Sequence, residues 1–276
     1  MPTMDSQRGD AAPSGAMVSS TGTTRVLILG GTTEARRLAE QLAGRADLDL
    51  TLSLAGRTAA PARQAVPVRS GGFGGAAGLA AYLARDHIDV LIDATHPYAR
   101  GISENAGAAA RMSGARIVAV RRPPWVAVAG DRWTEVETVG VAVRALDETP
   151  RRVLVALGRN DLAPLLQAAQ HFYLIRSVDP VDPPLRLPRA AYVTGRGPFL
   201  EADELALMRA HGIEAVIAKN SGGDATYGKI AAARALRIAV IMLLRPAAPA
   251  APNVETVEEA IAWLDHALTS AAARGV

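Results

Sequence analysis

The sequence contains no cysteine, and only 4% of its 276 residues are aromatic. Without cysteine there is no disulfide framework, no thiolate metal centre and no cysteine nucleophile, and no metal site is expected. Because aromatic residues are few and basic residues are dispersed, the stacking surface of a single-strand nucleic-acid-binding protein is missing, and no nucleic-acid partner is expected. No apolar run reaches the roughly 20 residues that a membrane helix needs, so we expect a soluble protein.

The composition is otherwise that of a globular protein, with 49% hydrophobic and 21% charged residues. The 30 basic residues exceed the 27 acidic ones only slightly, and both lysines, Lys219 and Lys229, lie in one glycine-rich stretch of an arginine-rich chain. Residues 1–24 are rich in Pro, Gly, Ser and Thr and lack the apolar core of a signal peptide. We therefore predict a disordered extension over 1–24 and a cytoplasmic location.

From Arg25 onwards, short apolar runs alternate with amphipathic stretches, which predicts an α/β fold with mostly parallel sheets. The alternation pauses after Pro123 and Pro124, at a bridge that includes a short helix at 139–146, and restarts after Pro150. We predict two Rossmann-like domains with a cleft between them, an N-terminal one over 25–149 and a C-terminal one over 150–276. The expected strands are 25–31, 48–56, 88–97, 116–123, 151–159, 172–177, 190–198, 214–223 and 237–244, and the expected helices are 34–43, 76–87, 99–114, 161–170, 201–212, 229–236 and 254–268.

A glycine loop, Gly30-Gly31-Thr32-Thr33-Glu34, follows the first strand and opens a helix. This is where a dinucleotide pyrophosphate binds in Rossmann folds, since glycines allow close approach and helix N-terminal amides attract phosphate. The loop does not match G-x-G-x-x-G, so a plain strand-to-helix turn stays an alternative.

The end of the second predicted strand carries Ser53 and Arg57 where NAD-binding proteins have an acidic residue. A hydroxyl and a guanidinium suit a 2′-phosphate, which favours NADP, although Arg57 could also be a solvated loop residue.

A second glycine-rich loop, Gly71-Gly72-Phe73-Gly74-Gly75, is too apolar for a simple linker. Its glycines suit a close approach of backbone to ligand, and Phe73 could either cover a flat ring or belong to the core.

Polar side chains follow several further strands at their carboxyl ends, where α/β sheets bind ligands. His96 and Tyr98 follow one strand of the first half as proton carriers or carboxylate anchors. In the second half, cations and amides at strand ends predict an anion pocket, and they are Arg176, Arg196, Lys219, Asn220, Ser221, Gly222, Gly223, Tyr227 and Lys229. Tyr227 and Lys229 are two residues apart rather than four, so the Tyr–Lys pair of short-chain dehydrogenases is missing.

The chain resembles the precorrin-6A reductases of cobalamin biosynthesis, the CobK/CbiJ family, between Arg25 and Leu244. The resemblance lies in the order and spacing of VLILGGTTEARRLA, RSGGFGG, IDATHPYA and AKNSGGDATYGK. It implies that two Rossmann-like domains bind NADPH and a tetrapyrrole-derived macrocycle in their cleft. It further implies hydride transfer to C19 and protonation at C18, which converts precorrin-6A to precorrin-6B. The carboxylates of such a ring explain basic strand ends, and the reaction needs positioning more than a nucleophile.

The resemblance assigns roles to the residues above. The expected cofactor-binding residues are Gly30, Gly31, Thr32, Thr33, Glu34, Ser53, Arg57, Gly71, Gly72 and Phe73. The expected substrate-binding residues are Gly74, Gly75, Arg176, Arg196, Asn220, Ser221, Gly222, Gly223, Tyr227 and Lys229. The expected catalytic residues are His96, Tyr98 and Lys219, with ordered water as a rival proton donor.

Two other classes fit the paired-domain plan. A nucleotide-sugar glycosyltransferase would bind a uridine nucleotide and ignore NADPH, and a non-catalytic NADP sensor would bind NADPH without the macrocycle. Channelling with neighbouring pathway enzymes, a monomer and a homo-oligomer are all left open.

Overall fold

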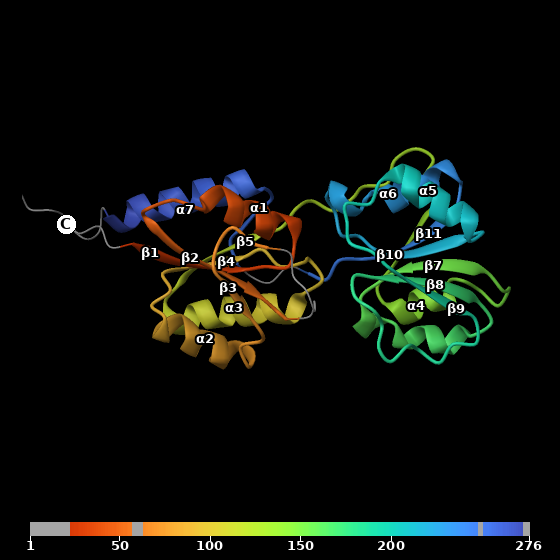
Figure 1. The fold of residues 1–276 in the computed structure, drawn as a ribbon, viewed down its shortest axis with the longest axis horizontal. Helices are drawn as coiled ribbons and strands as arrows, with labels where there is room; N and C mark the ends of the chain where they lie inside the picture. Colours follow the sequence, from red (N-terminus) through yellow and green to blue (C-terminus); the bar gives the residue numbers. More distant parts are fainter. Residues whose placement is uncertain (1–22, 57–62, 248–250, 273–276) are drawn as a thin grey trace, which may run out of the picture.

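The computed structural model describes residues 23–56, 63–247 and 251–272, which form two six-stranded sheets with helices on both faces (Figure 1). Every strand pairing in both sheets is parallel. The first sheet has the order β12-β5-β4-β1-β2-β3, and the second has the order β6-β11-β10-β7-β8-β9. The predicted α/β architecture of two Rossmann-like units is therefore confirmed. Arg57 lies outside the described residues.

The strands are β1 (Thr24–Leu29), β2 (Leu48–Leu54), β3 (Val68–Ser70), β4 (Val90–Asp93), β5 (Arg116–Val120), β6 (Trp133–Val136), β7 (Arg152–Ala156), β8 (Phe172–Ser177), β9 (Ala190–Thr194), β10 (Ala215–Lys219), β11 (Ala239–Leu243) and β12 (Asn253–Val254). The α-helices are α1 (Thr33–Leu42), α2 (Gly75–Arg85), α3 (Arg100–Ser113), α4 (Val139–Arg144), α5 (Glu201–Ala210), α6 (Gly228–Ala235) and α7 (Val257–Ala272). Short 3₁₀ helices are η1 (Arg159–Asp161), η2 (Ala163–Ala168) and η3 (Asp224–Thr226). None of the described helices is long and apolar enough to cross a bilayer.

Alternating side chains of the central strands build a core on each face of each sheet. In β1, Val26 and Ile28 pack under α1 and α7, whereas Leu27 and Leu29 pack under α2 and α3. The second sheet follows the same rule on its two faces, with α4 and η2 against one core and α5 and α6 against the other. Burial on both faces explains why these strands read as continuous apolar runs in the sequence.

Each sheet takes one strand from the chain segment that the sequence analysis gave to the other domain. β6 pairs with β11 in the second sheet, and β12 pairs with β5 in the first. Helix α7 then packs against α1 of the first half. The predicted boundary at 149/150 is therefore wrong for β6 and α4, which belong to the second sheet, and for β12 and α7, which belong to the first. The chain crosses between the halves twice, after β5 and after β11 (Figure 1).

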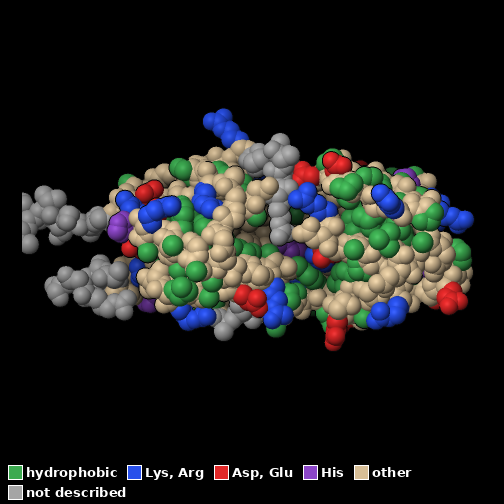
Figure 2. Space-filling view, turned by 90° about the horizontal axis from the view of Figure 1, so that it is seen from below, with side chains coloured by type: hydrophobic (Ala, Val, Ile, Leu, Met, Phe, Trp, Pro, Cys, Tyr) green, Lys and Arg blue, Asp and Glu red, His purple; other side chains and the backbone are tan. Residues whose placement is uncertain are grey.

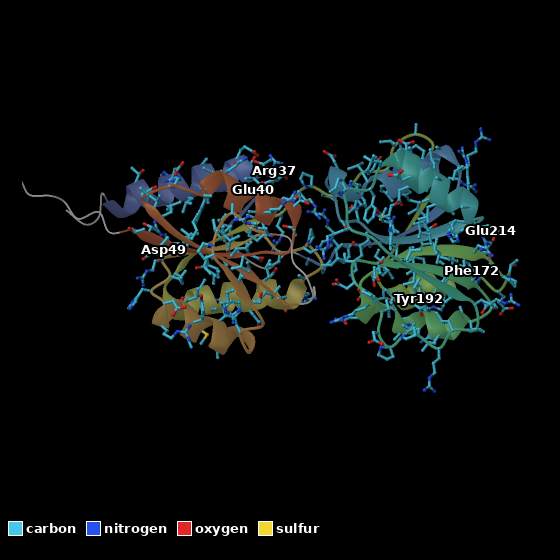
Figure 3. The ribbon with its side chains drawn as sticks, viewed as in Figure 1. Arg37, Glu40, Asp49, Phe172, Tyr192 and Glu214 are labelled. Carbon is cyan, nitrogen blue, oxygen red and sulfur yellow. The ribbon has the colours of Figure 1, made fainter. Side chains whose placement is uncertain are left out.

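The carboxyl ends of the strands in the two sheets face each other. In Figure 3, Asp49 near the start of β2 lies toward one end of the molecule, while Phe172 and Glu214 at the starts of β8 and β10 lie toward the opposite end. The loops that follow the strands therefore meet in the middle, where ligands bind in sheets of this kind.

Candidate active site

The glycines of the first loop bring the backbone close to its neighbours at the end of β1. A Cβ at Gly30 would lie 2.7 Å from Leu52 Cδ1, so the buried Leu52 side chain would have to shift. Gly31 has a φ of +111°, a backbone conformation that residues with a side chain rarely adopt. The turn therefore favours glycine at both positions, and the backbone at Gly31 is open to a ligand.

Thr32 caps helix α1 rather than pointing outward. Its Oγ1 accepts a hydrogen bond from the Ala35 amide at 3.1 Å and donates one to the Ala94 carbonyl at 2.7 Å. Within the described part of the chain, the amides of Thr33 and Glu34 have no protein acceptor. The first turn of α1 therefore presents N–H groups suited to an anion.

An arginine that the sequence analysis did not select, Arg69, lies beside Ser53. The two residues are in register on β3 and β2, and Arg69 Nη1 is 3.3 Å from Ser53 Oγ. The guanidinium also donates to the Gly71 and Gly72 carbonyls, at 2.6 and 2.7 Å. Arg69 thus places a positive charge at the end of β2 independently of Arg57. Its position in the RSGGFGG stretch is the sequence feature from which it could have been predicted.

Phe73 is packed on both sides within the first half. The Arg69 guanidinium lies 3.7 Å from the centre of the Phe73 ring, and Tyr82 meets the ring edge-on at 5.2 Å. Gly74 and Gly75, with φ of +82° and +84°, form the turn into α2. Packing accounts for the position of Phe73, and its contact with a ligand ring stays a prediction.

A buried ionic network holds the loop that follows β4. The Asp93 carboxylate is 2% exposed, pairs with Arg121 and accepts hydrogen bonds from the Thr95 amide and hydroxyl at 3.1 and 2.6 Å. Arg121 also donates to Ser103 Oγ at 2.8 Å. The network fixes the loop that carries His96.

His96 connects the two halves as a neutral imidazole. Its Nδ1 accepts from the Tyr98 amide at 3.3 Å, so Nε2 carries the proton and donates to Ser221 Oγ at 3.1 Å. Burial, and then the positive charges of Arg122 and Lys219, lowers the pKa of His96 to about 3. An imidazole with this pKa is not a proton donor near neutral pH.

The Tyr98 hydroxyl is engaged on both sides by the second half. It donates to the Leu243 carbonyl and accepts from the Asn220 amide at 2.8 Å. Burial raises the pKa of Tyr98 to about 12. These two hydrogen bonds hold the first half of the protein to the second.

Lys219, at the end of β10, forms an ion pair with Asp161, which follows β7. The Nζ to Oδ2 distance is 2.7 Å, and the Lys219 and Asp161 side chains are 20% and 35% exposed. The ammonium also lies 5.1 Å from the centre of the Tyr98 ring. All three predicted catalytic residues are half-buried, and Lys219 is the one that carries a charge. The sequence analysis missed Asp161.

The loop after Lys219 is fastened to the first crossover. The Asn220 side chain accepts from the Trp125 amide at 2.7 Å and donates to its carbonyl at 2.9 Å, and the Trp125 indole donates to the Gly223 carbonyl at 2.9 Å. Gly222 has a φ of +66°, and a Cβ there would overlap the Pro123 carbonyl oxygen. The side-chain amide of Asn220 is thus hydrogen-bonded to the Trp125 backbone, and these contacts hold the loop against the crossover.

Arg122 joins this loop to the first turn of α1. Its guanidinium forms an ion pair with Glu34, and its Nε donates to the Ser221 carbonyl at 2.7 Å. The structure therefore brings the loops after β1, β4 and β10 together. Neither Arg122 nor its link to Glu34 was predicted from the sequence.

Two predicted substrate-binding arginines have partners within the second half. Arg176 forms a buried ion pair with Glu204 and stacks 4.1 Å from the centre of the Phe199 ring. Arg196, 48% exposed, lies 3.9 Å from Asp179. The contacts of Arg176 are those of a structural residue, and a ligand contact of either arginine stays a prediction.

Lys229 is a buried lysine, 4% exposed, under the loop that follows β10. Its Nζ donates to the Thr226 carbonyl at 2.5 Å and lies 4.7 Å from the centre of the Trp125 ring. Burial lowers the pKa of Lys229 to about 7. Tyr227 lies beside the same tryptophan and bonds to Arg234. Lys229 and Tyr227 therefore pack against Trp125, which is hydrogen-bonded to the Lys219–Gly223 loop.

Figure 2 shows a recess between the two halves with Lys and Arg side chains at its border. A cavity of about 70 Å³ lies at this junction and is lined by Arg100, Arg121 and Arg245 among others. A more open depression of about 310 Å³ lies at the other edge of the first sheet, near Arg25 and Asp49. Neither lining includes a predicted site residue. We place the candidate site in the recess because the loops after β1, β4 and β10 meet there.

Comparison with known proteins identifies what the chain is similar to. Residues 25–265 match the family "Precorrin-6x reductase CbiJ/CobK". A precorrin-6A reductase from Sinorhizobium sp is 53% identical over 247 residues, which cover 90% of this chain and 95% of that protein. A precorrin-6A reductase from Rhodobacter capsulatus is 48% identical, covering 89% of this chain and 98% of that protein. A solved structure of a CobK precorrin-6A reductase superposes with a TM-score of 0.85 at 47% identity, over 88% of this chain and 96% of that one.

Proposed function

Because the chain belongs to the precorrin-6x reductase family CbiJ/CobK, we propose that it reduces precorrin-6A to precorrin-6B with NADPH in the recess between its two halves. The observation that carries the proposal is the meeting of the first turn of α1 with the Lys219–Gly223 loop, through Glu34, Arg122 and Ser221. A dinucleotide on the first and a macrocycle on the second would be in contact. The names of the two relatives lack cobalt, which favours a metal-free macrocycle.

The cofactor supplies a hydride to C19 of the ring when it is bound, and C18 gains a proton. The donor groups at the end of the first sheet fit NADPH. The amides of Thr33 and Glu34 suit the pyrophosphate, and Gly31, where a Cβ would meet nothing within 4 Å, leaves room for it to approach. Ser53 and Arg69 offer a hydroxyl and a guanidinium for the 2′-phosphate, together with Arg57 as predicted from the sequence.

We assign the substrate contact to Lys219, with Asp161 as the residue that orients it. A macrocycle with acetate and propionate side chains needs cations at the recess, and Lys219 is a cation there whose side chain is 20% exposed. The neutral His96 ring and the bonded Tyr98 hydroxyl are proposed as positioning residues rather than proton donors. His96 would hold Ser221 and Tyr98 would hold Asn220, so the loop faces the nucleotide in one orientation.

The test is NADPH oxidation by the purified protein with precorrin-6A, run beside NADH and a control without substrate. The proposal predicts macrocycle-dependent loss of NADPH absorbance, a clear preference over NADH, and a product two mass units heavier. NADPH binding without oxidation would support the sensor alternative instead. Binding of a uridine nucleotide with indifference to NADPH would support the glycosyltransferase alternative, which the family match does not favour.

A further inference from the structure

Arg122 occupies a position that the proposed reaction itself does not explain. It directly follows Arg121 after β5, at the start of the first crossover, and its side chain is 15% exposed. One side of the guanidinium pairs with Glu34, and Nε donates to the Ser221 carbonyl at 2.7 Å. One side chain therefore contacts both faces of the recess.

Glu34 poses an electrostatic problem for a nucleotide in this position. Its carboxylate is only 20% exposed and belongs to the same helical turn as the amides offered to the pyrophosphate. Like charges a few ångströms apart still repel by several times the thermal energy at an effective dielectric constant of about 20. The paired guanidinium of Arg122 offsets this repulsion.

Arg122 also determines where the Ser221–Gly223 segment can lie. A Cβ added at Gly223 would lie 2.9 Å from Arg122 Cδ and 3.7 Å from Glu34 Oε1, so the loop packs directly on the ion pair. Arg122 holds Ser221 by its backbone carbonyl, while His96 holds it by its side chain. The loop is thereby fixed relative to the first turn of α1.

We propose that Arg122 is a positioning residue with two separable effects: it neutralises Glu34 so that the first turn of α1 accepts a dinucleotide phosphate, and it holds the Ser221–Gly223 segment against that turn. The inference rests on the proposed function, since it takes the phosphate at α1 from there. The first effect depends on the charge of Glu34. The second depends on the hydrogen bond to Ser221.

The two effects are separated by removing the charges one at a time. We would measure NADPH binding directly, from the change in NADPH fluorescence, for the full-length wild type, R122M, E34Q and the double variant E34Q/R122M, together with kcat on precorrin-6A. Met keeps much of the side-chain volume without the charge. The double variant leaves no buried carboxylate uncompensated, so it is expected to fold even if R122M is destabilised. R37M is the matched control, because Arg37 is an exposed arginine of α1 that pairs with Glu258 at 3.1 Å.

We expect R122M to weaken NADPH binding about tenfold or more, which corresponds to about 1.4 kcal/mol. R122M should also have a reduced kcat, because it loses the hydrogen bond to Ser221. E34Q/R122M should regain a Kd for NADPH within about threefold of the wild type, while its kcat stays as low as that of R122M, because the hydrogen bond to Ser221 is not restored. E34Q leaves the Arg122 charge unpaired beside the phosphate and should bind NADPH at least as tightly as the wild type, and R37M should bind it as the wild type does. An unchanged Kd in R122M, or a double variant that binds as weakly as R122M, would overturn the inference while leaving the proposed function intact. Failure of the wild type to bind NADPH would overturn the proposed function and this inference with it.

Discussion

At the scale of single residues, the charge state of His96 follows from what surrounds it. The ring is enclosed between Ser221 and the Tyr98 amide, and Arg122, Lys219 and Arg245 place positive charge around it. Both factors disfavour the imidazolium, so the ring serves as a neutral hydrogen-bond donor. Its contribution to the reaction is the position of the Ser221 side chain.

His96→Ala is expected to lower kcat by about tenfold to a hundredfold, because Ser221 loses its partner across the recess. NADPH binding should change by less than about threefold, since the hydrogen bonds of the ring go to Ser221 and to the Tyr98 amide and not to the first turn of α1. Steady-state kinetics and a direct NADPH titration on the same preparation check this. Equal losses in kcat and in NADPH affinity would show that His96 supports the whole fold rather than the loop.

Lys229 makes a prediction about stability and pH. Its folded pKa of about 7 lies below the ordinary value of 10.5, so between these values the unfolded chain binds more protons than the folded one. The free energy of unfolding therefore rises with pH in that window, by at most about 1.4 kcal/mol per pH unit. Lys229→Met lacks this dependence, so its stability relative to the wild type should be highest near pH 7 and fall toward pH 9. Urea unfolding of both proteins between pH 7 and 9 measures the difference in stability. A difference that does not change with pH would contradict the lowered pKa of the buried Lys229 amine.

Some site residues could be identified from the sequence and others could not. Glu34 and Lys219 stand next to recognisable glycine-rich stretches at strand ends. Arg69 stands in the RSGGFGG stretch, which gave a signal for it. Arg122 and Asp161 act through contacts with distant segments, such as the pairing of Arg122 with a residue 88 positions away. Which arginine among 28 makes such a contact is decided by the tertiary fold.

At the scale of elements, the Lys219–Gly223 loop depends on backbone that only glycine tolerates. Gly222→Ala meets both a positive φ and the Pro123 carbonyl. We expect it to destabilise the protein by about 1–3 kcal/mol and to reduce kcat strongly, because the Lys219–Gly223 loop would have to move away from the Pro123 carbonyl.

Gly101→Ala is the matched control for this substitution. Gly101 lies in the first turn of α3, and a Cβ there would meet nothing within 4 Å. Alanine should therefore stabilise the helix by about 0.5–1 kcal/mol without affecting turnover. Thermal unfolding and steady-state rates of both variants test the pair, and equal effects at the two positions would mean that the geometry at Gly222 does not matter.

Long apolar strands and amphipathic helices could be predicted from the sequence, and very short elements could not. The strand β10 and the helix α5 fall inside their expected ranges because burial and periodicity mark them. The expected helix at 161–170 is the 3₁₀ helix η2, where Pro164 stands in the first turn. Strands β3 and β12, of three and two residues, are too short to show a period.

At the scale of the whole molecule, the exchange of β6 and β12 makes the two halves depend on one another. The fragment 25–149 would lose Val257, Ala260 and Leu264 from the core beneath α1 and would carry β6 without its partner β11. We expect it to be largely unfolded, whereas a chain of 23–121 joined by a flexible linker to 252–272 should fold, since that chain contains one complete sheet. Far-UV circular dichroism with thermal unfolding tests both. A cooperative, native-like transition in 25–149 would show that the exchanged elements are dispensable.

The exchange also explains why the domain boundary could not be derived from the sequence. In the sequence, 133–144 lies in the bridge where the alternation pauses, and 253–272 is expected only as a helix; the strands β6 and β12 found there carry no sequence feature that indicates which sheet receives them. Sheet membership is a pairing over long distances along the chain, such as Asn253 with Ala119.

The central claim, direct hydride transfer to a macrocycle between the halves, is tested most directly with isotopes. Precorrin-6A would be reduced with NADPH that carries deuterium at the transferable position, and the product would be examined by mass spectrometry and NMR. The account predicts one deuterium in the product, at C19, and, with unlabelled NADPH in D₂O, one solvent deuterium at C18. A product without deuterium from the labelled NADPH would contradict direct transfer.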